Sequence, residues 1–464
     1  MKTYILTLLS FSFFTFAVHA QDIAGSWNGS LQVGGSQLRV VLNISKTANG
    51  YTSTLDSPDQ GAKGIPVSNT LFENGKLNIE ISAAGIVYSA DLQNDTFVGT
   101  FKQGGKEFPL TLSKGEVVTE PSKRPQEPQK PYPYNSEEVT FENVKAQITL
   151  AGTLTLPPQK GKFPAVILIS GSGPQNRDEE LLGHKPFLVI ADYLTRHGIA
   201  VLRFDDRGVG QSKGVFKGAT SADFASDVES AVAYLRTRQN IRQIGLMGHS
   251  EGGLIAPMVA ATNSNVAFIV LLAGTGIRGD KLLLMQQELI ARANGESEND
   301  IALGKKVNEK AFDLIVKSTD SEQLKNDLTV YLAQTLKENP TMKPPGVSDE
   351  VFIAQEVATS TNPWFRYFMK YDPVSSLKKV KCPVLALNGE KDLQVPAKEN
   401  LSVIESTLKK SGNNEVTTKM YAGLNHLFQE CKTGSPFEYP TISQTFSPVV
   451  MEDFTNWIKQ QTKE

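Results

Sequence analysis

Gly248-His249-Ser250-Glu251-Gly252 is the stretch of sequence from which the fold can be deduced. It follows the apolar run 244–247, which we expect to be a buried strand, and it leads into a segment that we expect to be helical from about Glu251. A serine between two glycines at such a turn is typical of a nucleophile elbow, because the tight turn excludes bulky flanking side chains and lifts the hydroxyl above the sheet. The N-terminus of the following helix favours negative charge beside that hydroxyl. We therefore predict that Ser250 is a nucleophile.

A serine hydroxyl needs a neighbouring base, because it is unreactive at its own pKa. Beyond residue 20 the chain has four histidines: His184, His197, His249 and His426. Of these, His426 follows the last expected strand, 416–421, where the chain order of serine, acid and histidine places the base. His249 lies inside the elbow, and we expect its side chain to point away from the serine hydroxyl. Elimination therefore predicts His426 as the general base.

The acid that orients this histidine should follow the expected strand 384–387. The loop there contains two candidates, Glu390 and Asp392. Asp392 lies farther along the loop, and apolar residues and Pro396 after it can fix its position. We predict that Asp392 holds His426 in the correct tautomer and stabilises the imidazolium, with Glu390 as the alternative.

An oxyanion hole requires two preorganised backbone N–H donors. One donor should be the amide of Glu251, directly after the nucleophile, and the other should come from the loop after the first buried strand. That loop reads Ser170-Gly171-Ser172-Gly173-Pro174, and its glycines allow the backbone to turn its N–H groups inward. We assign the second donor to Ser172, with Gly173 as the alternative.

The rest of residues 137–464 alternates apolar strands with amphipathic helices. This pattern predicts an α/β fold in which helices cover both faces of a mostly parallel sheet. Residues 276–371 interrupt the alternation with several expected helices, and we interpret them as a helical cap over the carboxyl edge of the sheet. Asp205-Asp206-Arg207-Gly208 follows a strand but lacks the continuation of a phosphate-binding loop, so we expect it to brace neighbouring loops.

The segment before this domain has a different character. Residues 21–115 contain short alternating runs separated by Asn49-Gly50, Asn74-Gly75 and Gly104-Gly105, which predicts a small all-β module with hairpins. We expect this module to bind or to pack rather than to hold a second active site. Residues 116–136 carry five prolines and predict a semi-rigid linker.

Residues 1–20 resemble a secretory signal peptide. Lys2 precedes an apolar run from Tyr4 to Val18, and Val18-His19-Ala20 provides small residues at a cleavage site. We therefore expect an exported protein, periplasmic or secreted, with a retained membrane anchor as the alternative. The net charge of −2 gives no attraction to nucleic acid.

The two cysteines do not predict a disulfide. Cys382 precedes a strand, whereas Cys431 follows His426 at the opposite edge of the expected sheet. A strand of six residues spans about 20 Å, far more than the roughly 7 Å that a disulfide tolerates between Cα atoms. No cluster of His, Cys and carboxylate residues has metal-ligand spacing, so we expect no cofactor.

The chain resembles the α/β-hydrolase superfamily in an ordered set of features. These are the loop 170–174, the Asp206-Arg207-Gly208 segment, the elbow, Asp392 and His426. The position of the cap resembles that of the serine-aminopeptidase-like branch. The whole layout, with Asp56-Ser57-Pro58-Asp59-Gln60-Gly61-Ala62 in the β module, is similar to bacterial EstD-like carboxylesterases. The resemblance implies that the substrate is a small-molecule ester with a short acyl chain. Ser170 departs from the superfamily pattern, which commonly has histidine at the start of the oxyanion loop.

Two other functions remain open from the sequence. A peptidase of the aminopeptidase type would need acidic residues in the cap to hold a substrate ammonium, and the candidates are Glu288, Glu296 and Glu356. A non-catalytic carbohydrate-binding protein would instead use the β module. The sequence does not determine the oligomeric state.

Overall fold

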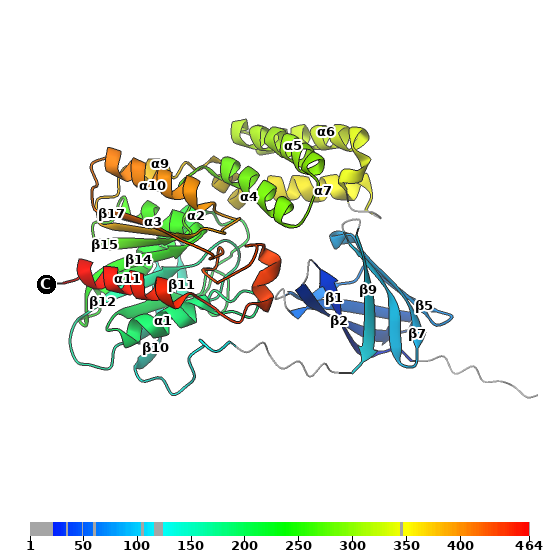
Figure 1. The fold of residues 1–464 in the computed structure, drawn as a ribbon, viewed down its shortest axis with the longest axis horizontal. Coiled ribbons are helices and arrows are strands. Elements are labelled where there is room, and N and C mark those ends of the chain that lie inside the picture. The colour runs from blue at the N-terminus through cyan, green and yellow to red at the C-terminus, as the bar shows by residue number, and fades with distance from the viewer. Residues whose placement is uncertain are drawn as a thin grey trace, which may run out of the picture.

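The computed structural model describes residues 22–33, 36–48, 50–58, 62–103, 106–115, 124–343 and 347–463. The predicted signal peptide, residues 1–20, lies outside these ranges, as do Asn49 and the Gly104-Gly105 hairpin signal. Figure 1 shows a curved β-sheet near the N-terminus beside a larger body in which helices flank a second sheet.

The N-terminal module is a nine-stranded antiparallel sheet, which confirms the all-β prediction. Its spatial order is β4-β3-β2-β1-β9-β8-β7-β6-β5. Asn74 and Gly75 join β5 to β6 with φ values of 50° and 76°, the left-handed conformation that a two-residue hairpin loop requires. The strands are β1 (Gly25–Val33), β2 (Ser36–Thr47), β3 (Gly50–Ser57), β4 (Ala62–Pro66), β5 (Asn69–Glu73), β6 (Lys76–Ile81), β7 (Ile86–Gln93), β8 (Thr96–Gln103) and β9 (Lys106–Lys114).

The second sheet has eight strands in the order β10-β11-β13-β12-β14-β15-β16-β17. The first two pair antiparallel with each other and β11 pairs antiparallel with β13, whereas all the remaining pairs are parallel. The strands are β10 (Asn135–Asn143), β11 (Ile148–Leu156), β12 (Phe163–Ile169), β13 (Ala200–Phe204), β14 (Ile241–His249), β15 (Val266–Leu272), β16 (Val384–Gly389) and β17 (Val416–Tyr421). Most of the central strand residues are buried, as expected of a sheet covered on both faces.

Helices cover both faces of this sheet, as predicted (Figure 1). On one face, α1 (Pro186–Arg196) and α11 (Pro448–Gln461) share an apolar core with the strands. On the other face lie α2 (Ser221–Arg236), α3 (Glu251–Ala260), α9 (Val374–Leu377) and α10 (Ala397–Lys410). Thr220 is the N-cap of α2, where it forms a reciprocal capping box with Asp223.

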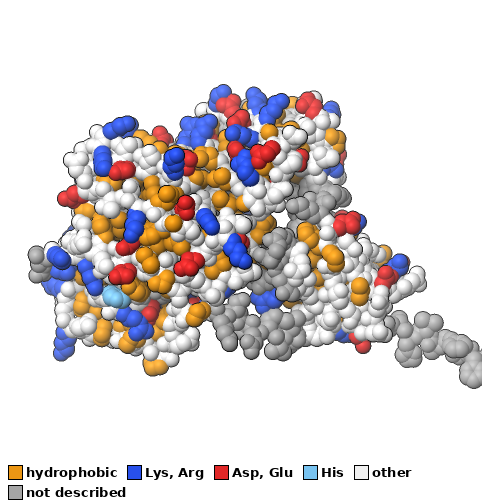
Figure 2. Space-filling model, in the orientation of Figure 1, with side chains coloured by type: hydrophobic (Ala, Val, Ile, Leu, Met, Phe, Trp, Pro, Cys, Tyr) orange, Lys and Arg blue, Asp and Glu red, His pale blue; other side chains and the backbone are white. Residues whose placement is uncertain are grey.

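Among the described residues, five α-helices lie within the predicted cap range 276–371. They are α4 (Gly279–Ala293), α5 (Glu298–Lys317), α6 (Ser321–Glu338), α7 (Asp349–Ser360) and α8 (Pro363–Lys370). These helices share an apolar core of their own, centred on Ile315, Leu324 and Leu328. On the face seen in Figure 2, basic and acidic side chains are interspersed over these helices, with no patch of a single sign.

The described end of the predicted linker is anchored to the second domain. Arg124 donates hydrogen bonds to the carbonyls of Leu182 and Pro440, and the side chain of Gln126 accepts one from the amide of Thr445. The chain therefore docks on the α/β body before β10 begins. Cys382 and Cys431 are both free thiols, as expected from their positions. Among the described residues, none of the helices combines the length and apolarity that crossing a membrane would require.

Candidate active site

Ser250 lies at the turn between β14 and α3 in a strained conformation. Its φ and ψ angles are 53° and −114°, a region that residues with a side chain rarely adopt. Its amide donates a hydrogen bond of 2.9 Å to the carbonyl of Leu272 on β15. A Cβ atom on Gly248 would lie 1.9 Å from the carbonyl oxygen of Gly252, and one on Gly252 would lie 2.1 Å from that of Ile169. Both glycines are therefore required by close backbone contacts.

Asp392 and His426 lie together at the same edge of the sheet. The ring Nδ1 of His426 is 2.8 Å from Oδ2 of Asp392, and both side chains are almost fully buried. Oδ1 of Asp392 accepts hydrogen bonds of 2.8 Å from the amides of Gln394 and Val395. This holds the carboxylate fixed, so that Nδ1–H can donate to it and Nε2 of His426 is left for another partner. Glu390, the alternative acid, is exposed and accepts a bond from the amide of Gly423 instead.

The loop predicted to complete an oxyanion hole begins level with the elbow, because Ile169 pairs with Gly248 across β12 and β14. The amide of Gly171 is occupied by a 2.7 Å hydrogen bond to Oε1 of Glu179. Ser172 is the next residue in the loop, and it lines one cavity together with Ser250 and Glu251. The structure thus brings both predicted donors to the nucleophile, and their role in catalysis stays a prediction.

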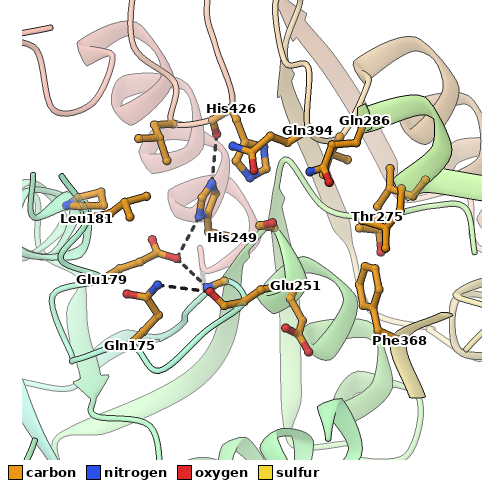
Figure 3. Close-up of a pocket in the computed structure, with 18 of the residues that line it drawn as sticks. Gln175, Glu179, Leu181, His249, Glu251, Thr275, Gln286, Phe368, Gln394 and His426 are labelled. Carbon is orange, nitrogen blue, oxygen red and sulfur yellow. Dashed lines mark hydrogen bonds and ion pairs between the residues drawn. The ribbon is translucent and has the colours of Figure 1, made fainter. Parts of the chain in front are cut away.

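The cavity above Ser250 has a volume of about 240 Å³. Its floor contains Ser250 and His426, and cap helices α4 and α8 contribute Leu282, Trp364 and Phe368 to its walls. Figure 3 shows Phe368, Thr275 and Gln286 on one side of this space, with Glu179 and Leu181 on the other. The cap therefore covers the candidate site with mainly apolar side chains.

Two family models and a curated protein are similar to parts of this chain. The model of the serine aminopeptidase family (S33) matches residues 186–335, and the model of the prolyl oligopeptidase family matches residues 346–462. Esterase EstD from Thermotoga maritima is 27% identical over 292 residues. The chain has the fold of an α/β hydrolase. The match covers 62% of this chain and 61% of the length of EstD.

Solved structures similar to this chain include two that are named an α/β hydrolase or an esterase. The α/β hydrolase GrgF from Penicillium sp. sh18 is 15% identical, with a TM-score of 0.42, and the match covers 70% of this chain and 99% of GrgF. Est1E from Butyrivibrio proteoclasticus, solved with ferulic acid bound, is 18% identical, with a TM-score of 0.40, and the match covers 70% of this chain and 98% of Est1E.

Glu179 and His249 form a buried ion pair beneath the cavity above Ser250. Nδ1 of His249 lies 3.0 Å from Oε1 of Glu179, and Nε2 lies 3.1 Å from the backbone oxygen of His426 (Figure 3). Both ring nitrogens face acceptors, so only the doubly protonated ring donates to both. Burial opposes that charge, but Glu179, the backbone oxygen of His426 and Asp392 together raise the pKa of His249.

This pair connects three parts of the site. Glu179 holds the amide of Gly171 in the oxyanion loop, and His249 belongs to the elbow and holds the backbone of His426. The prediction that the His249 side chain points away from the serine agrees with these contacts. The sequence reasoning missed Glu179, because it lies in the acidic run Asp178-Glu179-Glu180, and the run does not indicate which carboxylate is buried.

The side chain of Glu251 forms a second connection, which the sequence reasoning also missed. Its carboxylate accepts hydrogen bonds from Ser221 Oγ at 2.6 Å and from Trp364 Nε1 at 2.8 Å, and the Ser172 side chain also donates to it. Burial raises the pKa of Glu251 against the opposing effect of these bonds. Glu251 thus ties α8 of the cap directly to the elbow and to the oxyanion loop.

The Asp205-Asp206-Arg207 segment braces the loops around the site, as expected. Asp206 accepts hydrogen bonds of 2.9 Å from the Ser170 hydroxyl and from the amide of Gln175. Burial is the main cause that raises the pKa of Asp206 to about 7. Arg207 forms a buried ion pair with Asp227 on α2. The contacts of Asp206 hold the two ends of the loop that contains Ser172.

The remaining predicted residues lie elsewhere. His184 lines the outer part of the cavity and is buried, which lowers its pKa to about 4, and His197 lies exposed at the end of α1. The cap acids proposed for a peptidase do not line the described cavity above Ser250. Among the described residues, no group of three or more His, Cys, Asp and Glu side chains could hold a metal ion.

Proposed function

We propose that this hydrolase is a serine carboxylesterase that cleaves short-chain carboxylic esters through Ser250, His426 and Asp392. The observation that carries the proposal is the 2.8 Å contact between His426 Nδ1 and a carboxylate that is itself fixed by two backbone amides. This contact leaves His426 with one ring nitrogen to accept a proton from a hydroxyl in the same cavity.

The mechanism follows from this arrangement. His426 removes the proton of Ser250 as the serine oxygen attacks the ester carbonyl, and the amides of Ser172 and Glu251 hold the oxyanion. His426 then protonates the departing alcohol, which leaves an acyl group on Ser250. In the second half, His426 takes a proton from water, the hydroxide attacks the acyl carbonyl, and the acid is released with the serine restored.

The size of the cavity supports a small acyl group. Its volume of about 240 Å³ lies below the roughly 300–1,000 Å³ of pockets that hold drug-sized ligands. Leu282, Trp364 and Phe368 give it apolar walls. An alkyl chain of a few carbons would be buried there, whereas a longer chain would have to displace cap residues.

A panel of p-nitrophenyl esters from acetate to dodecanoate tests this proposal. We expect kcat/KM to be highest for the short-chain esters and ester turnover to be lost in Ser250→Ala. In Asp392→Asn we expect kcat to fall by about 10⁴-fold, as it does when the orienting carboxylate of a comparable triad is neutralised. Ser447→Ala serves as the control, because Ser447 is a buried serine outside the candidate site. Full ester turnover by Ser250→Ala would refute the mechanism.

A serine peptidase is the second candidate, because both matching family models are described as peptidase families. Two observations weigh against it. Glu288 forms ion pairs with Arg292 and Lys305, and Glu179 is already paired with His249. Aminoacyl p-nitroanilides belong in the same panel, and a preference for them over the esters would favour the peptidase.

We also propose that the protein is exported, with cleavage after Ala20. The support is the charged start, the apolar run and the small residues at positions 18 and 20 of the sequence. Intact-mass analysis of protein from the periplasm or medium should give a chain that begins at Gln21. Recovery of the full-length chain from the membrane would favour the retained anchor instead.

A further inference from the structure

The N-terminal module contains a cavity that the proposed reaction does not use. Its volume is about 550 Å³, more than twice that of the cavity above Ser250. The module supplies most of its walls from the concave side of the curved sheet. The lining residues there are mainly apolar: Leu31, Leu38, Val40, Leu55, Ile65, Ala84, Ile86, Phe101 and Phe108, with Ser57 and Gln103.

The two ends of the module are built differently. At one end, aromatic rings fill the interior: Trp27 and Phe97 have ring centroids 4.3 Å apart, and Phe72 lies against Phe97 at 6.0 Å. At the other end, which includes the start of β2 and the start of β7, the interior is lined mainly by aliphatic side chains, with Phe101 and Phe108, and remains open. The module is therefore a cup with a closed base rather than a filled barrel.

The α/β domain covers the mouth of this cup. Asn294, which follows α4, is joined to Ser435 by a hydrogen bond of 3.0 Å, and both residues line the cavity. The short helix η4 (Pro436–Thr441) contributes Phe437, and Figure 1 shows this red-orange segment beside β1 and β2. Two parts of the catalytic domain thus form a polar rim above an apolar interior.

The charges of this rim limit the chemistry of an occupant. Glu296 and Glu438 are the charged residues in the described lining, which includes no Lys, Arg or His. A carboxylate or phosphate head group would be repelled there, and an apolar interior gives a charged group no compensation. An uncharged molecule with an extended apolar part would bury that part against the cup and leave any polar group at the rim.

We propose that the cup is a binding site for one uncharged lipophilic molecule, separate from the cavity above Ser250. The volume lies within the range of pockets that enclose small ligands, and apolar walls with a few polar groups at the mouth are typical of such pockets. Helix α4 lines both cavities, with Gln286 at one and Ala293 at the other. Seven residues of helix separate these contacts by about 10 Å.

The test uses the full chain and N-phenyl-1-naphthylamine, an uncharged fluorescent probe whose emission rises in apolar surroundings. We expect saturable binding that persists after Ser250 is sulfonylated with phenylmethylsulfonyl fluoride, which blocks only the catalytic cavity. Ala84→Phe and Val40→Phe should each fill the cup and weaken the probe at least about tenfold. Val98→Phe is the matched control, because Val98 is 42% exposed.

A competition experiment tests the charge argument. Dodecanol should displace the probe at a lower concentration than dodecanoate does at pH 8. Four results would overturn the proposal: no saturable binding to the folded wild type, binding that sulfonylation abolishes, binding that both folded cup variants retain, or stronger displacement by the anion. Circular dichroism shows whether each variant is folded. If Ala84→Phe or Val40→Phe does not fold, Leu38→Glu is used in its place. Ester turnover is measured in parallel, so that loss of esterase activity and loss of cup binding are distinguished.

Discussion

Replacing Glu179 by Gln should isolate the charge of the ion pair beneath the site. Oε1 of Glu179 accepts from both the Gly171 amide and His249, so the amide oxygen of Gln can occupy its place and keep both hydrogen bonds. Oε2 has no hydrogen-bond partner, and the new NH₂ group would replace it. The substitution therefore removes the negative charge with little change in shape.

The magnitude follows from the two choices left to His249. If the ring keeps both protons, it becomes an unpaired buried cation, which costs about 3–5 kcal/mol. If it loses one proton, a ring nitrogen faces an oxygen without a hydrogen, which costs about 1–3 kcal/mol. The cheaper choice decides, so we expect Glu179→Gln to lower the free energy of unfolding by about 2 kcal/mol near neutral pH.

The pH dependence has a definite sign. The pKa of His249 in the folded protein is raised above its ordinary value of about 6.5. The stability that the ion pair contributes is therefore fully present below the pKa of the unfolded chain, and it is lost as pH rises through the pKa of the folded protein. The deficit of Glu179→Gln should therefore be largest near pH 6 and smaller at pH 9.

Urea unfolding at pH 6, 7.5 and 9 measures this deficit, and kcat/KM is measured in parallel. We expect kcat to fall more than KM rises, because the pair positions the oxyanion loop and the backbone of His426. Glu180→Gln is the control, since Glu180 is the exposed neighbour in the sequence. A deficit that stays the same from pH 6 to pH 9 would refute a charged His249.

Three further predictions concern the same site. Gly252→Ala should lower the free energy of unfolding by about 3 kcal/mol and abolish ester turnover, because its Cβ would lie 2.1 Å from the Ile169 carbonyl; thermal unfolding and a turnover assay check both. Trp364→Phe removes the donor to Glu251 and should cost about 1–3 kcal/mol in urea unfolding together with a lower kcat/KM, while Trp457→Phe on α11 should leave kcat/KM unchanged. The pKa of His184 is lowered to about 4, so the free energy of unfolding should fall by up to about 3 kcal/mol as pH drops from 6.5 to 4, and His184→Gln should flatten that slope in urea titrations.

The sequence predicted the parts of the site that depend on local pattern and chain order. The parallel strands β14, β16 and β17 end at the same edge of the sheet, so the residues after 247, 387 and 421 were expected to meet there. Ser250 and His426 line one cavity, and His426 contacts Asp392. The cap helices could also be predicted, from the spacing of their apolar residues. The exact start of a helix was harder to predict. Both Thr220 and Ser221 can cap α2, and only the structure shows that Thr220 does so.

Contacts between distant residues were not predictable in this way. Glu179 is 70 residues from His249, and Trp364 is 113 residues from Glu251. Arg124 reaches Pro440, which turns the end of a predicted spacer into a docked segment. In each case the residue type does not predict the partner of the side chain, because a carboxylate, an indole or a guanidinium on an unknown surface is most often solvated.

The ion pair of Glu179 and His249 also bears on the charge of the proposed reaction. The rings of His249 and His426 are 4.8 Å apart, so two imidazolium ions there would repel each other by about 3 kcal/mol at an effective dielectric constant of 20. Asp392 and Glu179 each supply one negative charge beside these rings. Before attack the four groups carry one net negative charge, and they become neutral when His426 takes the proton of Ser250. Glu179 therefore offsets the positive charge of His249 beside the imidazolium that His426 becomes. In Glu179→Gln, where His249 gives up one proton, the net charge is unchanged, so the expected fall in kcat comes from the hydrogen bond that the neutral ring no longer donates to residue 179 or to the backbone of His426.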